Sequence, residues 1–362
     1  MGKVVINQLN IYIFIMKKCI SLLVILAAVF YLTACNEEDF SSKEFYEYIV
    51  YLQSGNTDYN EYSLPVHPYT DSEESLGYFS IGCGGSLPNP EKIIVELEQD
   101  SILFNRYNRV KYDIDSSKYA RLLSKDKYFI SQFTVEIPAK NKNQYVKVPI
   151  FVNTIGLSPD SVYFIPISIK SVSGGYKVNP DKKDILYQVN VENYYAEQKF
   201  PSLYSMNGYE LVLDNNNENA EVITIGNEVI KISPDLGSGL IETRIIKPVS
   251  KHSVRVLAAK ETVGNMNAPT VDELKNKTIV LTVENDNSVT ITPFGTIQVD
   301  QLDGVQIDGS PWNIYREERI NMVDESTYKY FYLRYRYRVQ AANGTYPATW
   351  QYVQERLRRE EI

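Results

Sequence analysis

Residues 330–339, YFYLRYRYRV, set the fold class of this chain, because polar and apolar side chains alternate along them. Successive side chains of a β-strand point to opposite faces of the sheet. One face then carries core residues, namely Phe331, Leu333, Tyr335, Tyr337 and Val339. The other face carries a ladder of tyrosine and arginine, namely Tyr330, Tyr332, Arg334, Arg336 and Arg338.

This stretch is the first arm of a predicted hairpin. The arm covers residues 328–339, Asn343-Gly344 forms the turn, and the return arm runs from Tyr346 to about Leu357. Asn-Gly is a preferred hairpin turn. Trp350 and Val353 in the return arm also fit helical spacing, but the turn favours a strand. We expect Trp350 to lie in the core.

The rest of the chain also predicts strands. Residues 145–152, 161–169, 187–191, 222–232, 239–246, 253–258, 278–283 and 288–293 alternate or are rich in β-branched residues, with turn residues between them. Such spacing is typical of an antiparallel sandwich. Pro149 and Pro166 lie within strand-like runs and suggest edge strands or bulges. Short helical segments are expected only at residues 117–123 and 271–274. The fold class is therefore all-β.

The amino terminus has the layout of a signal peptide. Met16-Lys17-Lys18 precedes an apolar stretch, residues 19–31, that is shorter than the ~20 residues a membrane-spanning helix needs. The following Leu32-Thr33-Ala34-Cys35 resembles the lipobox of bacterial lipoproteins. We therefore predict a signal peptide over residues 1–34 and lipid attachment, including palmitate, at Cys35. An uncleaved membrane anchor with a chance cysteine is the alternative.

The segments around this cleavage site carry two further expectations. A second apolar run at residues 4–15 precedes the basic start, so translation from Met16 is an alternative. The acidic run at residues 36–39 resembles the signal that sends Bacteroidota lipoproteins to the outer face of the outer membrane. A solvated linker is the other interpretation. Residues 35–45 are then a lipidated tether.

A domain boundary is expected where the strand pattern stalls, at residues 196–201. At ~100 to 200 residues per domain, the mature chain has room for two domains. We assign residues 46–197 to the first domain and residues 198–362 to the second.

The sequence shows no motif for a zinc site, a catalytic triad or nucleic-acid binding. His67 and His252 have no neighbouring ligands or partners, which disfavours a zinc site or a catalytic triad. Cys83 lies between glycines and is expected to be a buried apolar residue. A net charge of -8 disfavours nucleic acid. We expect no cofactor, no metal and no nucleic-acid partner.

Two acidic segments are candidate sites. The run at residues 214–218 has calcium-loop spacing at its first positions but lacks the required glycine and closing glutamate. A polar turn is the better interpretation. Glu317-Glu318 is a carboxylate doublet near an aromatic residue and the best candidate for a hydrolytic pair, but adjacent strand residues face opposite ways. Ion pairs with Arg316, Arg319 or the arginine ladder are expected instead. We therefore predict that the protein is not an enzyme.

Aromatic content is the most unusual feature of the composition, with 29 Tyr against 2 Trp. Sugars stack their C–H faces on flat rings, and polar neighbours bind their hydroxyl groups. Most of the tyrosines are expected in cores or on sheet faces. Trp312 stands in a turn-rich segment, residues 308–313. Trp312, Asn313 and Tyr315 are therefore the candidate ligand-binding residues.

Several of these segments together resemble one family. They are the lipobox with its acidic follower and residues 189–196, 330–337 and 350–360. They are similar to two-domain surface lipoproteins encoded in polysaccharide-utilisation loci of Bacteroidota. The resemblance covers nearly all of the mature chain. It implies an immunoglobulin-like N-terminal domain followed by a β-rich C-terminal domain of uncharacterised function, a second antiparallel sandwich or barrel, and it supplies no site residues.

The leading hypothesis is a non-catalytic outer-membrane lipoprotein that faces the cell exterior. It would hold oligo- or polysaccharide near a TonB-dependent importer. A structural or protein-interaction spacer without glycan binding is the second hypothesis. A hydrolase is the third, and it would require two close carboxylates beside Trp312.

Overall fold

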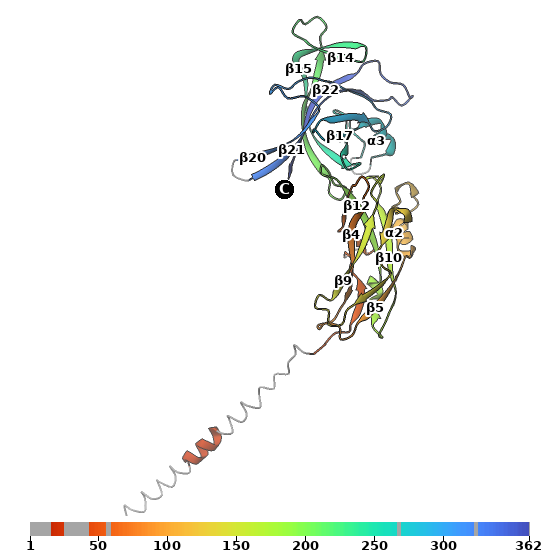
Figure 1. The fold of residues 1–362 in the computed structure, drawn as a ribbon, viewed down its shortest axis with the longest axis vertical. Helices are drawn as coiled ribbons and strands as arrows, with labels where there is room; N and C mark the ends of the chain where they lie inside the picture. Colours follow the sequence, from red (N-terminus) through yellow and green to blue (C-terminus); the bar gives the residue numbers. More distant parts are fainter. Residues whose placement is uncertain (1–15, 25–42, 56–58, 266–268, 322–324, 362) are drawn as a thin grey trace, which may run out of the picture.

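The computed structural model describes residues 16–24, 43–55, 59–265, 269–321 and 325–361. Two β-rich domains follow each other along the chain (Figure 1). Cys35, the predicted lipid attachment site, lies outside the described residues. Within those residues, no helix is long and apolar enough to cross a membrane.

The N-terminal domain is a sandwich of two sheets. One has the strand order β11-β1-β4-β9-β7, and the other has the order β2-β12-β10-β5-β8, with β3 on β12 and β6 on β10. The strands are β1 (Ile49–Leu52), β2 (Glu61–Tyr62), β3 (Val66–Pro68), β4 (Ser75–Cys83), β5 (Ile93–Glu98), β6 (Arg121–Leu122), β7 (Tyr128–Ile130), β8 (Thr134–Ile137), β9 (Tyr145–Val152), β10 (Tyr163–Val172), β11 (Lys177–Val178) and β12 (Asp184–Glu192). This confirms the predicted sandwich.

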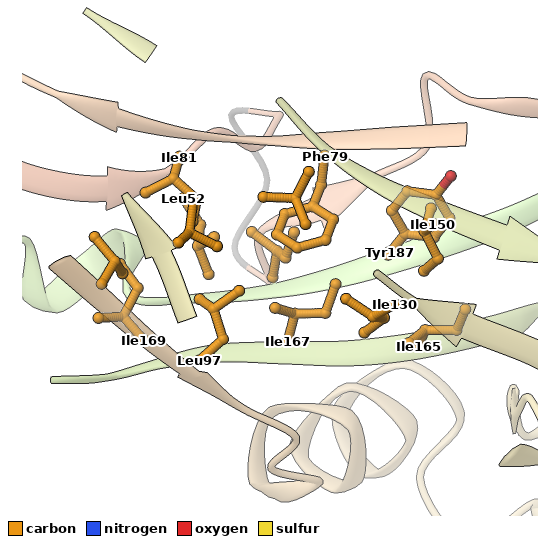
Figure 2. Packing of buried hydrophobic residues seen from close by; sticks show 14 of the residues in the cluster. Leu52, Phe79, Ile81, Leu97, Ile130, Ile150, Ile165, Ile167, Ile169 and Tyr187 are labelled. Carbon is orange, nitrogen blue, oxygen red and sulfur yellow. The ribbon is translucent and has the colours of Figure 1, made fainter. Parts of the chain in front are cut away.

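Alternating residues of the two sheets build the core of this domain (Figure 2). Phe79 and Ile81 of β4 point inward from one sheet, and Ile165, Ile167 and Ile169 of β10 point inward from the other. Burying each such side chain stabilises the fold by about 1.5–3 kcal/mol. Cys83 also lies in this core, as expected, and burial raises the pKa of its thiol to about 11.

The two strand prolines lie in central strands, so the expectation of edges or bulges was wrong. Pro166 pairs with β12 on one side. On its other side β10 changes partner, because Tyr163 and Phe164 pair with β6 and the pairing with β5 begins at Ser168. Pro149 likewise lies just beyond the last pair of β9 with β7, Ile130 with Ile150. Each proline therefore occupies a position where no neighbouring strand requires a hydrogen bond from a backbone N–H.

The helix expected at residues 117–123 was also misplaced. That segment holds a short 3₁₀ helix, η2 (Ser116–Lys118), and β6, while the helix is α2 (Ile102–Tyr112). Tyr107 of α2 packs against Phe164 of β10, with ring centroids 4.9 Å apart. Two other 3₁₀ helices are η3 (Lys125–Lys127) and η4 (Pro180–Lys182). This face of the sandwich therefore carries a second, smaller core.

The C-terminal domain is one sheet with the strand order β18-β17-β16-β15-β13-β22-β21-β19, with β14 on β15 and β20 on β21. The strands are β13 (Ser202–Leu213), β14 (Glu221–Ile225), β15 (Glu228–Pro248), β16 (Ser253–Leu257), β17 (Thr278–Val283), β18 (Val289–Pro293), β19 (Gln298–Gln301), β20 (Ile314–Asn321), β21 (Glu325–Arg338) and β22 (Gln351–Glu361). The sheet curls into a barrel, since its ends β18 and β19 lie side by side and Ile291 N–H donates to Gln301 Oε1.

Several local predictions in this domain are confirmed. The predicted runs 278–283 and 288–293 are β17 and β18, and the turn residues between them join the two strands, with Asn287 at φ 65°. The helical segment is α3 (Val271–Lys277), which begins with a capping box between Thr270 and Glu273. The run at residues 222–232, however, is not one strand, because a turn at Gly226 divides it between β14 and β15.

The terminal hairpin exists as predicted, with β21 and β22 paired from Thr327–Glu361 to Tyr337–Gln351. The return arm is a strand, but it begins at Gln351, not at Tyr346. The turn at Asn343-Gly344 lies in the long connection, where Gly344 has φ 81°. Trp350, expected in the core, is only partly buried, and the guanidinium groups of Arg336 and Arg338 lie 4.3 and 4.4 Å from its ring centroid.

The ladder face of β21 is covered at its centre. The hairpin of β14 and the first half of β15 folds over it and forms a small core of Leu211, Ile223, Ile230, Ile232, Leu302 and Tyr352. Arg334 and Arg336 are therefore 3% and 5% exposed. Each pairs with an acid of the hairpin, Arg334 with Glu221 at 2.6 Å and Arg336 with Glu228 at 2.7 Å.

Candidate functional site

A groove of about 650 Å³ lies on the ladder face of the C-terminal sheet. Its floor comes from three adjacent strands: Asn207 and Tyr209 from β13, Gln354 and Arg356 from β22, and Tyr332 and Arg334 from β21. Strand alternation places these side chains opposite the barrel core. One wall is residues 232–236 of β15, and the other is the loop of residues 305–312.

Arg334 ties the two walls together beneath the groove. Its Nη1 and Nη2 donate to Glu221 Oε1 and Oε2 at 2.9 and 2.6 Å. Its Nη1 also donates to the carbonyl of Asp303 at 3.1 Å. The loop passes so close that a Cβ on Gly304, which has φ 144°, would lie 2.1 Å from Nη1. The groove is thus preorganised by a charge-assisted network.

The loop wall is held by its own polar groups. Ser310 N–H donates to Asp308 Oδ1, and Arg316 Nη1 donates to Asp308 Oδ2, both at 3.0 Å. The bonds from Ser310, followed by that from Arg316, lower the pKa of Asp308 to about 2. Val305 and Ile307 project into solvent at the rim. A rigid loop with an apolar rim suits ligand contact.

Of the three candidate ligand-binding residues, only Trp312 lines the groove. Asn313 is 4% exposed, and both ends of its amide are hydrogen-bonded: Nδ2 donates to Leu302 O, and Oδ1 accepts from Arg334 N–H. Tyr315 packs on Phe331 in the barrel core and donates to Glu317. Asn313 and Tyr315 therefore lie beneath the surface, because alternation and the turn direct both side chains inward.

The sequence did not single out most of the groove residues. Asn207, Tyr209, Gln354 and Arg356 come from strands about 150 positions apart. The available signal was the alternation of β22, which assigns Gln354 and Arg356 to the face opposite Val353 and Leu357. That β13 lies beside β22 could not be known from either strand alone.

The carboxylates near the groove are engaged elsewhere. Glu317 accepts from the Tyr315 hydroxyl and Glu318 from the Tyr332 hydroxyl, at 2.7 and 3.2 Å, not from the arginines that we expected. The Glu355 backbone contributes to the floor, but its side chain lies with the core and accepts from Tyr335 at 2.8 Å. Burial raises the pKa of Glu355 to about 7.

The histidines and other potential ligands do not gather at this groove. His67 is buried in the N-terminal domain, between the Ser75 and Tyr187 hydroxyl groups at 3.0 and 2.9 Å. Burial lowers its pKa to about 4. The part of the chain that the structure describes contains no group of three His, Cys, Asp or Glu residues that would hold a metal ion.

Solved structures of Bacteroides proteins share this fold. A Bacteroides ovatus protein of unknown function aligns with a TM-score of 0.58 at 14% identity, covering 86% of this chain and 94% of that one. A multidomain protein including DUF1735, also from Bacteroides ovatus, gives 0.56 at 14% identity with the same coverage. An auxiliary nutrient binding protein from Bacteroides thetaiotaomicron gives 0.50 at 11% identity, covering 83% and 90%. These similarities show the fold alone.

Comparison of the sequence with family models gives a match for each half of the chain. No curated protein matches it. Two domain models do match: the model of an N-terminal domain over residues 43–175, and the model of the C-terminal domain over residues 183–357. The chain therefore belongs to the two-domain family of Bacteroidota proteins that these N-terminal and C-terminal models describe.

Proposed function

We propose that the protein is a non-catalytic surface lipoprotein that binds glycan through the groove of its C-terminal domain. The observation that carries this proposal is the groove's composition. Trp312, Tyr209 and Tyr332 supply aromatic rings, and Asn207 and Gln354 supply amides on the same surface. Sugar rings need both kinds of group, since their C–H faces are apolar and their hydroxyl groups are not.

The chemistry of the lining acids supports binding without cleavage. Glycoside hydrolysis needs one carboxyl group with a raised pKa and a second one across the scissile bond. Asp308 has a lowered pKa and is paired with Arg316. Glu221 is paired with Arg334, and the Glu355 carboxyl lies in the barrel core. Each of the three carboxyl groups is thus either paired with an arginine or directed into the barrel core.

The proposed cellular role rests on the predicted lipid attachment at Cys35 and on the proteins of similar fold. Lipidation of Cys35 would fix the chain to the outer membrane, and the acidic residues behind it favour the outer face. A protein of similar fold is an auxiliary nutrient binding protein, which supports a role in nutrient uptake. We propose that the groove holds oligo- or polysaccharide beside a TonB-dependent importer.

Calorimetry of the full chain in detergent against a broad glycan panel tests the binding role. We expect a glycan that binds, and Tyr209→Ala should weaken its affinity about five- to tenfold, since an aromatic contact contributes ~1–1.5 kcal/mol. Tyr145→Ala is the matched control, because Tyr145 is 42% exposed on the N-terminal domain and Tyr209 is 39% exposed. Equal losses in the two variants, or no binding to any glycan, would count against the groove.

The lipid anchor has a separate test. Cys35→Ala should abolish labelling of the chain with a palmitate analogue and release it from the membrane fraction. Cys19→Ala removes another cysteine of the leader and should leave both properties unchanged. Labelling that survives in Cys35→Ala would contradict lipidation at this residue.

The alternative function, a spacer, also has a structural basis. The two domains are clamped by a bidentate ion pair between Arg255 and Asp160, at 2.6 and 2.7 Å. Two domains joined by such a contact suit a protein that holds a partner protein at a set distance from the membrane. Glycan-independent capture of one defined surface protein, together with no glycan binding, would favour this role.

A further inference from the structure

The charged side chains that line the groove, and the ion pairs they form, indicate the charge of its ligand. The lining contains three acids and two arginines. Glu221 is neutralised by Arg334, and Asp308 by Arg316. The Glu355 carboxyl group faces the barrel interior, where it accepts from Tyr335. Arg356 is therefore the one lining charge that these contacts leave without compensation.

The Arg356 side chain stacks on an aromatic ring and exposes its N–H donors to solvent. Its guanidinium lies over the ring of Tyr330, 5.8 Å from the centroid, and its side chain is exposed. It forms no ion pair with any residue that the structure describes. Two acids share this face, and each accepts a hydroxyl hydrogen bond, Glu318 from Tyr332 and Glu360 from Ser326. A guanidinium stacked on an aromatic ring keeps its N–H edges free for a planar anion.

A second arginine extends this surface along the same strand. Arg358 lies two residues further along β22 and therefore on the same face. Its guanidinium stacks on Tyr328 at 5.2 Å, it is exposed, and it likewise has no ion-pair partner within the described residues. Tyr328, Tyr330 and Tyr332 form a continuous row beneath the two arginines, with Tyr330 and Tyr332 stacked at 5.7 Å. In a chain of net charge -8, this is a local cationic surface.

We infer that the groove selects an anionic glycan, with Arg356 and then Arg358 binding acidic groups on successive parts of the sugar chain. This inference rests on the proposed glycan-binding function and adds the chemical class of the ligand. Arginine binds carboxylate and sulfate groups through two parallel N–H donors. Uronic acids and sulfated sugars both offer such a group, so the experiment separates them.

The test compares ligands that differ only in charge. Calorimetry on the full chain in detergent would use uronic-acid oligosaccharides against their methyl esters, and sulfated oligosaccharides against their desulfated forms. We expect one acidic form to bind about tenfold or more tightly than its neutral counterpart, and added salt should weaken that binding. Whichever pair shows the difference identifies carboxylate or sulfate as the recognised group.

Variants test whether the preference for acidic glycans depends on Arg356. Arg356→Ala should remove the preference for the acidic form, and Arg356→Gln, which keeps length and polarity, should do the same. Arg106→Ala, at an exposed arginine of α2, is the control and should keep the preference. If neutral glycans bind but no acidic form is preferred, the inference fails and the proposed function stands. If no glycan of either kind binds, both fail.

Discussion

Glu355 is a carboxyl group inside the barrel of the C-terminal domain. Tyr335 donates to its Oε1, while Oε2 has no hydrogen-bond partner in the described structure. Burial raises its pKa from 4.5 to about 7, against the opposing effects of Tyr335 and Arg244. The folded state therefore favours the protonated form, and ionising this group inside the barrel costs free energy.

Glu355→Gln should remove a pH dependence of stability. Since the folded pKa lies above the unfolded one, the stability that Glu355 contributes is complete below about pH 4.5 and is lost as the pH rises to about 7. At about 1.4 kcal/mol per pKa unit, the wild type should lose ~2–3 kcal/mol relative to the variant across this window. Urea unfolding followed by fluorescence would measure the loss, because both tryptophans lie in this domain.

His67, another buried titratable group, serves as an internal check. The lowered pKa of His67 acts in the opposite direction, because its stabilisation is lost as the pH falls from 6.5 towards 4. His67 is common to both proteins, so the difference between them isolates Glu355. A difference in unfolding free energy that stays constant from pH 4.5 to 8 would contradict the assignment.

At the scale of elements, the hairpin formed by β14 and the first half of β15 makes the groove wall. Two of its acids pair with buried arginines of β21, Glu221 with Arg334 and Glu228 with Arg336. Asp300 of β19 also pairs with Arg336, at 2.8 Å. Removing the acids would leave buried guanidinium groups with weaker partners, which destabilises more than the loss of an exposed pair.

The double variant Glu221→Gln/Glu228→Gln should therefore open this hairpin locally. Hydrogen exchange of residues 221–232 should accelerate about tenfold or more, corresponding to ~1.4 kcal/mol of local stability. Exchange in β16–β18 should not change. Glu218→Gln alters an exposed acid in the preceding turn and is the control. Unchanged protection of the hairpin would show that its small apolar core suffices.

These elements also show what the sequence can and cannot predict. The terminal hairpin was predictable because alternation and an Asn-Gly turn are local signals. Helix α2 was missed because only Phe104, Tyr107 and Asn108 face inward along its eleven residues, and its N-cap Ser101 makes no capping bond. The contact between β18 and β19 that closes the barrel could not be predicted either, because the local sequence of neither strand indicates it.

The candidate site was predictable only in part, for the same reason. Trp312 was identified from turn residues around it, and it does line the groove. The floor depends on β13 pairing with β22, a contact between residues such as Gly208 and Glu355. The cover over the arginine ladder depends on β15 bending across the sheet, with register shifts between Tyr209 and Leu213. Such tertiary contacts override local pattern.

At the scale of the whole molecule, the two domains meet at a junction, the elbow, where side chains of both domains form hydrogen bonds and an ion pair. The Gln198 amide donates to the carbonyls of Pro159 and Ser161 in the first domain, and Asn193 donates to Ser250 and Ser253 in the second. The ion pair of Arg255 with Asp160 bridges the domains directly, and the Arg255 guanidinium also lies 4.6 Å from the centroid of Phe294.

Asp160→Asn should loosen this elbow, because Arg255 is 3% exposed and would keep its charge in a site that no longer balances it. Small-angle scattering should show a broader distribution of domain orientations, and proteolysis between the domains should accelerate. Asp71→Asn is the matched control, since it removes another interdomain pair, Lys251–Asp71, whose side chains are both largely exposed. Exposed pairs contribute only about 0–1 kcal/mol, so this control should scatter like the wild type. If Asp160→Asn also scatters like the wild type, the backbone-directed bonds of Gln198 and Asn193 are enough to fix the elbow.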